Sequence, residues 1–292
     1  MRHRAFSPLR LAAIGGNTLT ELIRLKIFYI LLLFALALIG SSMFIARMSF
    51  QQEFQVLKDM SLGAMSIFSS LLAIVAAARL LPQDRDDRTV YAILVRPVPR
   101  SEYVAGKLLG VLLLLALSIL AMSALFFLVL YLREQTILGE TARQVAAARP
   151  KQLGASLEAV RDSAFTANLL SGIAVIYLKA CLLASLTLFI STFASTSTFT
   201  IMVAAFAYFI GHLQATAREF WLQEHGASLL GRIFLAAVAL VFPDLQLFDF
   251  SDEIVTGAVI PMALFLKAAA LGCFYVLIYL LLAIAVFSGK EL

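Results

Sequence analysis

The sequence predicts an all-α, polytopic membrane protein with six transmembrane helices and with both termini in the cytoplasm. Hydrophobic residues make up 62% of the chain and charged residues only 14%, whereas charged residues make up about 25% of ordinary soluble domains. The hydrophobic residues lie in runs long enough for a helix to cross a bilayer, which takes about 20 residues. The basic residues cluster at the ends of these runs, a pattern that sets orientation in a membrane and argues against a nucleic-acid surface.

Six apolar runs are long enough to be spans, and each is bounded by charged or hydroxyl-rich residues. The predicted spans are residues 27–45, 61–81, 108–132, 173–192, 197–213 and 264–287. The fourth and fifth are close in sequence, so the hydroxyl-rich residues 191–200 must contain a tight turn. No small-residue cleavage site follows the first run, so we expect it to remain in the membrane as a span.

The distribution of Arg and Lys predicts the orientation of the chain, because basic residues are enriched in cytoplasmic loops. Residues 1–26 and 82–107 are rich in Arg, which places both segments in the cytoplasm. With six spans, the C-terminus is cytoplasmic too, and residues 133–170 and 214–262 form extracytoplasmic loops. The second of these loops is acidic, as expected. The first is basic, but long loops cross a membrane largely regardless of their charge.

Residues 229–242 form a further apolar run that we do not assign as a span. The run is shorter than a bilayer-crossing helix, contains Arg232 and is followed directly by Pro243. These features favour an interfacial or re-entrant helix over a seventh span.

The segment before the first span is predicted to contain a helix break. Gly15-Gly16 interrupts a helix at little cost, and Thr18 with Glu21 fits a capping box that starts a new one. A helix from Leu19 to Ile45 would be about 40 Å long, longer than the ~30 Å apolar core, so its first turns would lie at the interface. Residues 9–14 form either a short amphipathic helix on the cytoplasmic surface or a frayed tail.

The charged segment between the second and third spans, residues 84–107, has a helical pattern of its own. Val90, Ile93 and Leu94 share one helical face. Pro97 ends this helix, because proline disfavours helical geometry in the residue before it.

Beyond a stiff corner at residues 97–99, Ser101 is expected to cap the next helix, with Glu102 in its first turn. That helix runs on into the third span. The arrangement suits a lever that transmits force from the cytoplasm to the span, and an ordinary charged connection is the alternative.

This segment resembles the cytoplasmic loop of type 2 ATP-binding-cassette (ABC) transporter permeases. The residues that carry the resemblance are Arg88-Thr89, Ile93-Leu94, Arg96-Pro97-Val98, Arg100, Glu102-Tyr103 and Gly106-Lys107. The most similar branch includes members that serve multicopper-enzyme maturation. Weaker likenesses to that branch extend over most of the chain: Lys58-Asp59, Ile210-Gly211-His212-Leu213, Phe242-Pro243-Asp244-Leu245 and Phe287-Ser288-Gly289-Lys290.

The resemblance implies that residues 1–292 form a single transmembrane permease domain of an ATP-driven exporter. Such a subunit would lie in the plasma membrane of a bacterium (the inner membrane of a Gram-negative one), pair with itself or a sister permease, and bind two ABC ATPase subunits. The residues that would couple it to the ATPase are Asp84, Arg88, Thr89, Ile93, Leu94, Pro97, Arg100 and Lys107. The acidic pair Asp86-Asp87 departs from the family pattern.

The sequence offers no site for catalysis by this chain. It contains no Gly-x-x-x-x-Gly-Lys-Ser/Thr loop to hold nucleotide phosphates, so we expect it to bind no cofactor and ATP to be hydrolysed on the partner subunit. His3, His212 and His225 lack metal-ligand spacing, and a solvated position is expected for His212. No Gly-x-Ser-x-Gly elbow presents a nucleophile.

An ion-coupled secondary transporter or channel without an ATPase partner is the alternative. Ion-coupled carriers usually keep acidic residues within their spans, and the predicted spans contain no Asp or Glu. Lys179 and Lys267 are the candidates for a substrate path. Both lie near the outer ends of their spans, where a Lys side chain can extend to the interface. If they faced a cavity, they would favour an anionic substrate.

Overall fold

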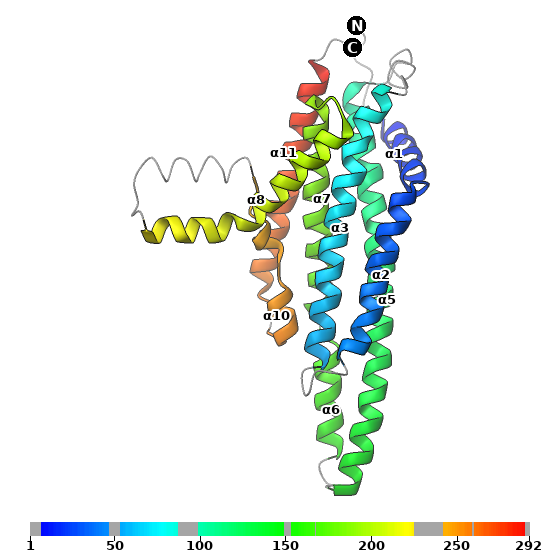
Figure 1. Cartoon of the computed structure of the whole chain (residues 1–292), viewed down its shortest axis with the longest axis vertical. Helices are drawn as coiled ribbons and strands as arrows, with labels where there is room; N and C mark the ends of the chain where they lie inside the picture. The colour runs from blue at the N-terminus through cyan, green and yellow to red at the C-terminus, as the bar shows by residue number, and fades with distance from the viewer. Residues whose placement is uncertain are drawn as a thin grey trace.

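The computed structural model is a bundle of long helices (Figure 1), and it describes residues 7–46, 53–86, 99–148, 153–166, 168–224, 242–258 and 260–289. Its elements in chain order are α1 (Pro8–Ile23), α2 (Lys26–Ala46), α3 (Glu53–Asp86), α5 (Arg100–Ala148), α6 (Leu153–Ala164), α7 (Asn168–Phe193), α8 (Ser197–Glu224), the 3₁₀ helix η2 (Leu245–Phe248), α10 (Ser251–Thr256) and α11 (Met262–Ser288). Six of these helices, α2, α3, α5, α7, α8 and α11, contain segments long and apolar enough to cross a membrane. The all-α, six-span part of the predicted fold class is therefore confirmed for the described residues, and the cytoplasmic position of the termini stays a prediction.

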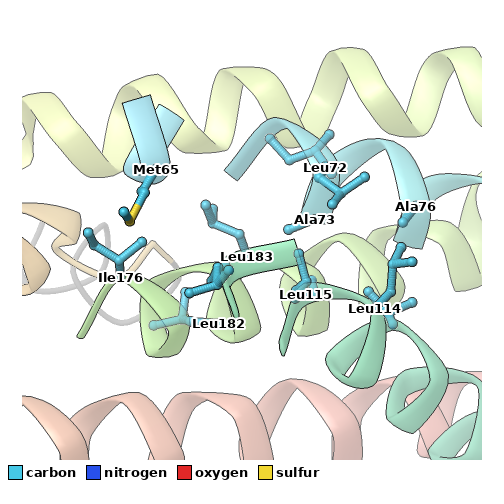
Figure 2. Packing of buried hydrophobic residues seen from close by; sticks show 14 of the residues in the cluster. Met65, Leu72, Ala73, Ala76, Leu114, Leu115, Ile176, Leu182 and Leu183 are labelled. Carbon is cyan, nitrogen blue, oxygen red and sulfur yellow. The ribbon is translucent and has the colours of Figure 1, made fainter. Parts of the chain in front are cut away.

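Helices α3 and α7 form the centre of the bundle. Within their most apolar segments, 67% of α3 and 72% of α7 is buried, against 22% of α2 and of α11. Apolar side chains of α3, α5 and α7 point toward one another in Figure 2, among them Met65, Leu114 and Leu183. Helix α7 is predominantly apolar and has no single polar face, so it is suited to this position.

The predicted interruption at Gly15-Gly16 is wrong. Helix α1 runs through both glycines from Pro8, and the break falls at Arg24 and Leu25, between α1 and α2. A continuous helix from Leu19 to Ile45 is therefore also wrong. Residues 9–14 are helical rather than frayed, and α1 buries one face while Leu9 is 81% exposed.

Close packing of α1 on α5 explains why these glycines do not act as breaks. A Cβ atom at Gly110 of α5 would lie 2.6 Å from Thr18 Cβ, and one at Gly106 would lie 2.7 Å from Ile14 Cγ2. A Cβ atom at Gly15 would meet Leu109 Cδ2 at 3.0 Å. Small residues on facing helices let two backbones approach closely. Thr18 is thus buried in this contact and is not a cap.

The connections at the end of the bundle where α3 begins are more helical than predicted. Helix α5 continues past the predicted span to Ala148, and α6 returns beside it as a hairpin that projects beyond the other helices (Figure 1). Buried Arg133 of α5 forms an ion pair with Glu53 at the start of α3. Lys58 also lies within α3.

The predicted tight turn at residues 191–200 is confirmed, since α7 ends at Phe193 and α8 begins at Ser197. The predicted interfacial helix at residues 229–242 lies almost wholly outside the described residues.

Candidate coupling site

Three of the eight predicted coupling residues lie in the described part of the chain: Asp84, Arg100 and Lys107. The other five, Arg88, Thr89, Ile93, Leu94 and Pro97, lie outside the described residues, as does the predicted short helix that they would form. The structure therefore describes the two ends of the charged segment. It brings these ends together at the same end of the bundle as the start of α1 and the end of α11 (Figure 1).

A buried ion pair joins α3 to α5 across the charged segment. Lys107 Nζ lies 2.8 Å from Asp84 Oδ2 and 3.6 Å from Glu21 Oε2 of α1. The Tyr103 hydroxyl also donates a hydrogen bond to Asp84 Oδ2. The side chains of Lys107 and Asp84 are only 6% and 9% exposed. Since removing one partner of a buried pair leaves an uncompensated charge, these groups hold the end of α3 against the first two turns of α5.

A second ion pair fixes the start of α1 on α5. Arg10 donates to both carboxylate oxygens of Glu102, with Nε to Oε2 at 2.8 Å and Nη2 to Oε1 at 2.9 Å. The backbone N–H of Ser7 also donates to Glu102 Oε1 at 2.9 Å. Such two-point Arg–carboxylate contacts are both strong and geometrically specific. The predicted place of Glu102 in the first turn is confirmed, but α5 begins at Arg100, so Ser101 is not its cap.

Arg100 connects the start of α5 to the end of α11. Its Nη1 atom donates to the Ser288 carbonyl at 2.8 Å. The last carbonyls of a helix have no partner within that helix, and a cation there also interacts favourably with the helix dipole. The ring of Tyr103 stacks on that of Phe287, with ring centroids 5.7 Å apart. The first two turns of α5 thus contact α1, α3 and α11.

Sequence reasoning found some members of this site and missed others. Glu102 and Tyr103 are part of the pattern that resembles ABC permeases, so a signal for them existed. Arg10 and Glu21 were not predicted as partners, because nothing local in the sequence shows which distant helix they face. In the described residues, no group of three or more His, Cys, Asp or Glu side chains is placed to hold a metal ion.

The predicted interfacial position of Lys179 is wrong. Its side chain is 1% exposed, and Nζ lies 3.1 Å from Ser66 Oγ of α3 and 3.0 Å from His212 Nε2 of α8. The Tyr208 ring lies beneath Nζ, 5.9 Å from it to the ring centroid. Lys179 cannot extend to the interface because α7 is the central helix and other helices surround it.

His212 is half-buried, and both of its ring nitrogens contact protein groups, so it is less solvated than predicted. Its Nδ1 atom lies 3.1 Å from the Tyr208 carbonyl. A carbonyl can only accept, so Nδ1 carries a proton. The Lys179 amino group and the His212 ring thus form a polar contact between α7 and α8.

Lys267 has different surroundings. It is exposed and lies five residues after the start of α11, as its predicted place near the end of a span requires. It lines a cavity of about 300 Å³ together with Gln214, Asp244 and Tyr275. The two lysines thus belong to two different environments and not to one shared site.

The six long, apolar helices define a multi-pass membrane protein. Residues 21–148 match the family model described as ABC-2 family transporter protein. The match covers less than half of the chain, but it includes the whole of α2, α3 and α5, and therefore both ends of the charged segment. It supports the interpretation of the chain as the membrane component of an ABC transporter, a permease that works with an ABC ATPase subunit. No curated protein matches the sequence.

Proposed function

We propose that this chain is the permease subunit of an ATP-driven exporter in a bacterial plasma membrane (the inner membrane of a Gram-negative cell). In this proposal two ABC ATPase subunits bind and hydrolyse ATP. They press on the charged segment between α3 and α5, at the cytoplasmic face. A second permease, either an identical copy or a sister chain, completes the pathway. The likeness to the branch for multicopper-enzyme maturation makes an export step in such a process the first context to test.

One observation carries the proposal: the buried Asp84–Lys107 pair joins the two ends of the charged segment. A force on that segment would reach α3 and α5 together, because separating the two helices would leave a buried charge without its partner. The contacts of Glu102 with Arg10 and of Arg100 with Ser288 extend the same movement to α1 and α11. A local push would thus displace several helices as a unit.

The test is to purify the chain from native membranes in mild detergent and to identify the proteins that co-elute. A stoichiometric subunit with a phosphate-binding loop, together with ATPase activity, is expected. In the reconstituted complex, Arg88→Glu or Pro97→Gly should uncouple ATP hydrolysis from transport while insertion is unchanged. Arg143→Glu is the control, because Arg143 is exposed and lies near the opposite end of α5. Full transport by both Arg88→Glu and Pro97→Gly would contradict the proposal.

An ion-coupled carrier is a second candidate, favoured by the Lys179–His212 contact. Ionisable groups buried within spans are costly and are usually kept for function. The two candidates differ in their energy source. A chain that elutes without an ATPase and transports in response to an imposed proton gradient, but loses that transport on Lys179→Gln, would establish the carrier. Transport that requires ATP would exclude it.

A further inference from the structure

A polar cavity of about 250 Å³ lies at the end of the bundle opposite the coupling site. The start of α3, the end of α6 and the end of α10 surround it, and its lining includes Gln55, Lys58, Asp162 and Thr166. At about 30 Å³ for each water molecule, the volume corresponds to roughly eight waters. This is enough room for a small polar ligand and too little for a lipid tail.

Lys58 is a buried cation that uses one of its hydrogen-bond donors within the described part of the chain. The residue is only 2% exposed, and its Nζ atom donates to the Ser163 carbonyl at 2.9 Å. An ammonium group has three N–H donors, and this is the one bond that it makes to the described residues. None of their carboxylates forms an ion pair with it. A buried charge of this kind is costly unless something pairs with it.

Thr166 supplies an independent second observation. Its Oγ1 atom is buried and has no hydrogen-bond partner among the described residues, although almost all buried polar atoms in proteins have one. This hydroxyl lines the same cavity as Lys58. Within the described residues, the Thr166 hydroxyl and the Lys58 ammonium group both have hydrogen-bond donors without an acceptor. A ligand with acceptor oxygens in this cavity would satisfy both.

We propose that this cavity binds a small anionic group, a carboxylate or a phosphate, through the Lys58 ammonium and the Thr166 hydroxyl. An anion compensates the buried charge and accepts hydrogen bonds from both side chains. Exposed Asp162 also lines the cavity. Its carboxylate repels the anion, so it limits the affinity of the cavity for that anion. The group can belong to a free anion or to the headgroup of a bound lipid.

The test is thermal melting of the detergent-purified full-length chain, titrated with sodium acetate or sodium phosphate against sodium chloride at equal ionic strength. A saturable rise in Tm is expected with at least one of the two anions. Lys58→Met should weaken the apparent affinity of the cavity for that anion by roughly tenfold or more, and Thr166→Val should weaken it by a smaller factor. Asp162→Asn should strengthen it several-fold. Lys26→Met, which changes an exposed lysine at the start of α2, is the matched control and should leave the affinity for the anion unchanged.

Two sets of results would overturn the proposal. One is the absence of a saturable effect beyond that of chloride, which would mean that water fills the cavity. The other is an equal apparent affinity for the anion in wild type, Thr166→Val and Asp162→Asn. This comparison can be made even if Lys58→Met fails to fold. Native mass spectrometry distinguishes the sources: an anionic lipid retained by wild type and lost in Thr166→Val assigns the site to a lipid headgroup. Because no ATPase is needed, failure here leaves the proposed function standing.

Discussion

The Asp84–Lys107 pair gives the sharpest prediction, because Asp84→Asn removes the negative charge of the pair and changes little else. Asp84→Asn keeps the side-chain volume and an acceptor for the Tyr103 hydroxyl, but it leaves Lys107 buried without its near partner. Breaking a buried pair typically costs 3–5 kcal/mol. Glu21 remains 3.6 Å from Lys107 Nζ and compensates part of the charge, so we expect a loss near the lower limit, about 3 kcal/mol.

For a chain of this size the loss corresponds to a fall in Tm of roughly 6–12 °C. The measurement is thermal melting in detergent, with Asp252→Asn as control because Asp252 is exposed on α10. The double variant Asp84→Asn with Lys107→Met should regain part of the loss, because it removes both charges. A Tm for Asp84→Asn within about 2 °C of wild type, or a double variant whose loss equals the sum of the two single losses, would refute this reasoning.

Three further predictions concern the other contacts. Arg10→Met leaves Glu102 buried without its guanidinium, so α1 should detach and become the first site of cleavage in limited proteolysis, unlike in wild type. Gly110→Ala should cost about 1–3 kcal/mol by overpacking against α1, seen as a lower Tm, whereas Gly139→Ala on the same helix meets nothing within 4 Å and should not. Lys179→Gln should lower Tm, because it removes a buried amino group that contacts side chains of two other helices, whereas Lys267→Gln should not. Export unchanged in both lysine variants would exclude them from the substrate path.

The axial positions of the helices were predictable from the sequence, because hydrocarbon thickness dictates the length of an apolar run. All six spans lie where the runs predicted them, and only their polar extensions differ, as in α5, which continues to Ala148. The extension has a simple reason: α6 packs along it, so this segment gains a helical partner that hydropathy alone does not reveal.

Lateral positions were not predictable in the same way. A residue's place along a span gives its depth in the membrane but not which helices surround it. Lys179 and Lys267 have similar depths by sequence, yet α7 is central and α11 peripheral, so one side chain is buried and the other exposed. The same reason explains Gly15-Gly16, since whether a glycine pair breaks a helix or packs it depends on a partner helix distant in sequence.

Helix α3 links the polar sites, and this connection limits how a signal can travel through the protein. It carries Asp84 near one end, Ser66 in its middle and Lys58 near the other end. From Lys58 to Asp84 is about 39 Å at 1.5 Å per residue, and a helix transmits displacement over such a length better than a chain of side chains does. Pro82 lies within this helix just before Asp84. Because proline removes a backbone hydrogen bond and favours a kink there, the turn that carries Asp84 is the part of α3 best able to move on its own. If the proposed function is correct, a force at the candidate coupling site would either bend α3 at Pro82 or shift the whole helix, and only the second response would carry it to Lys179 and to the cavity of Lys58.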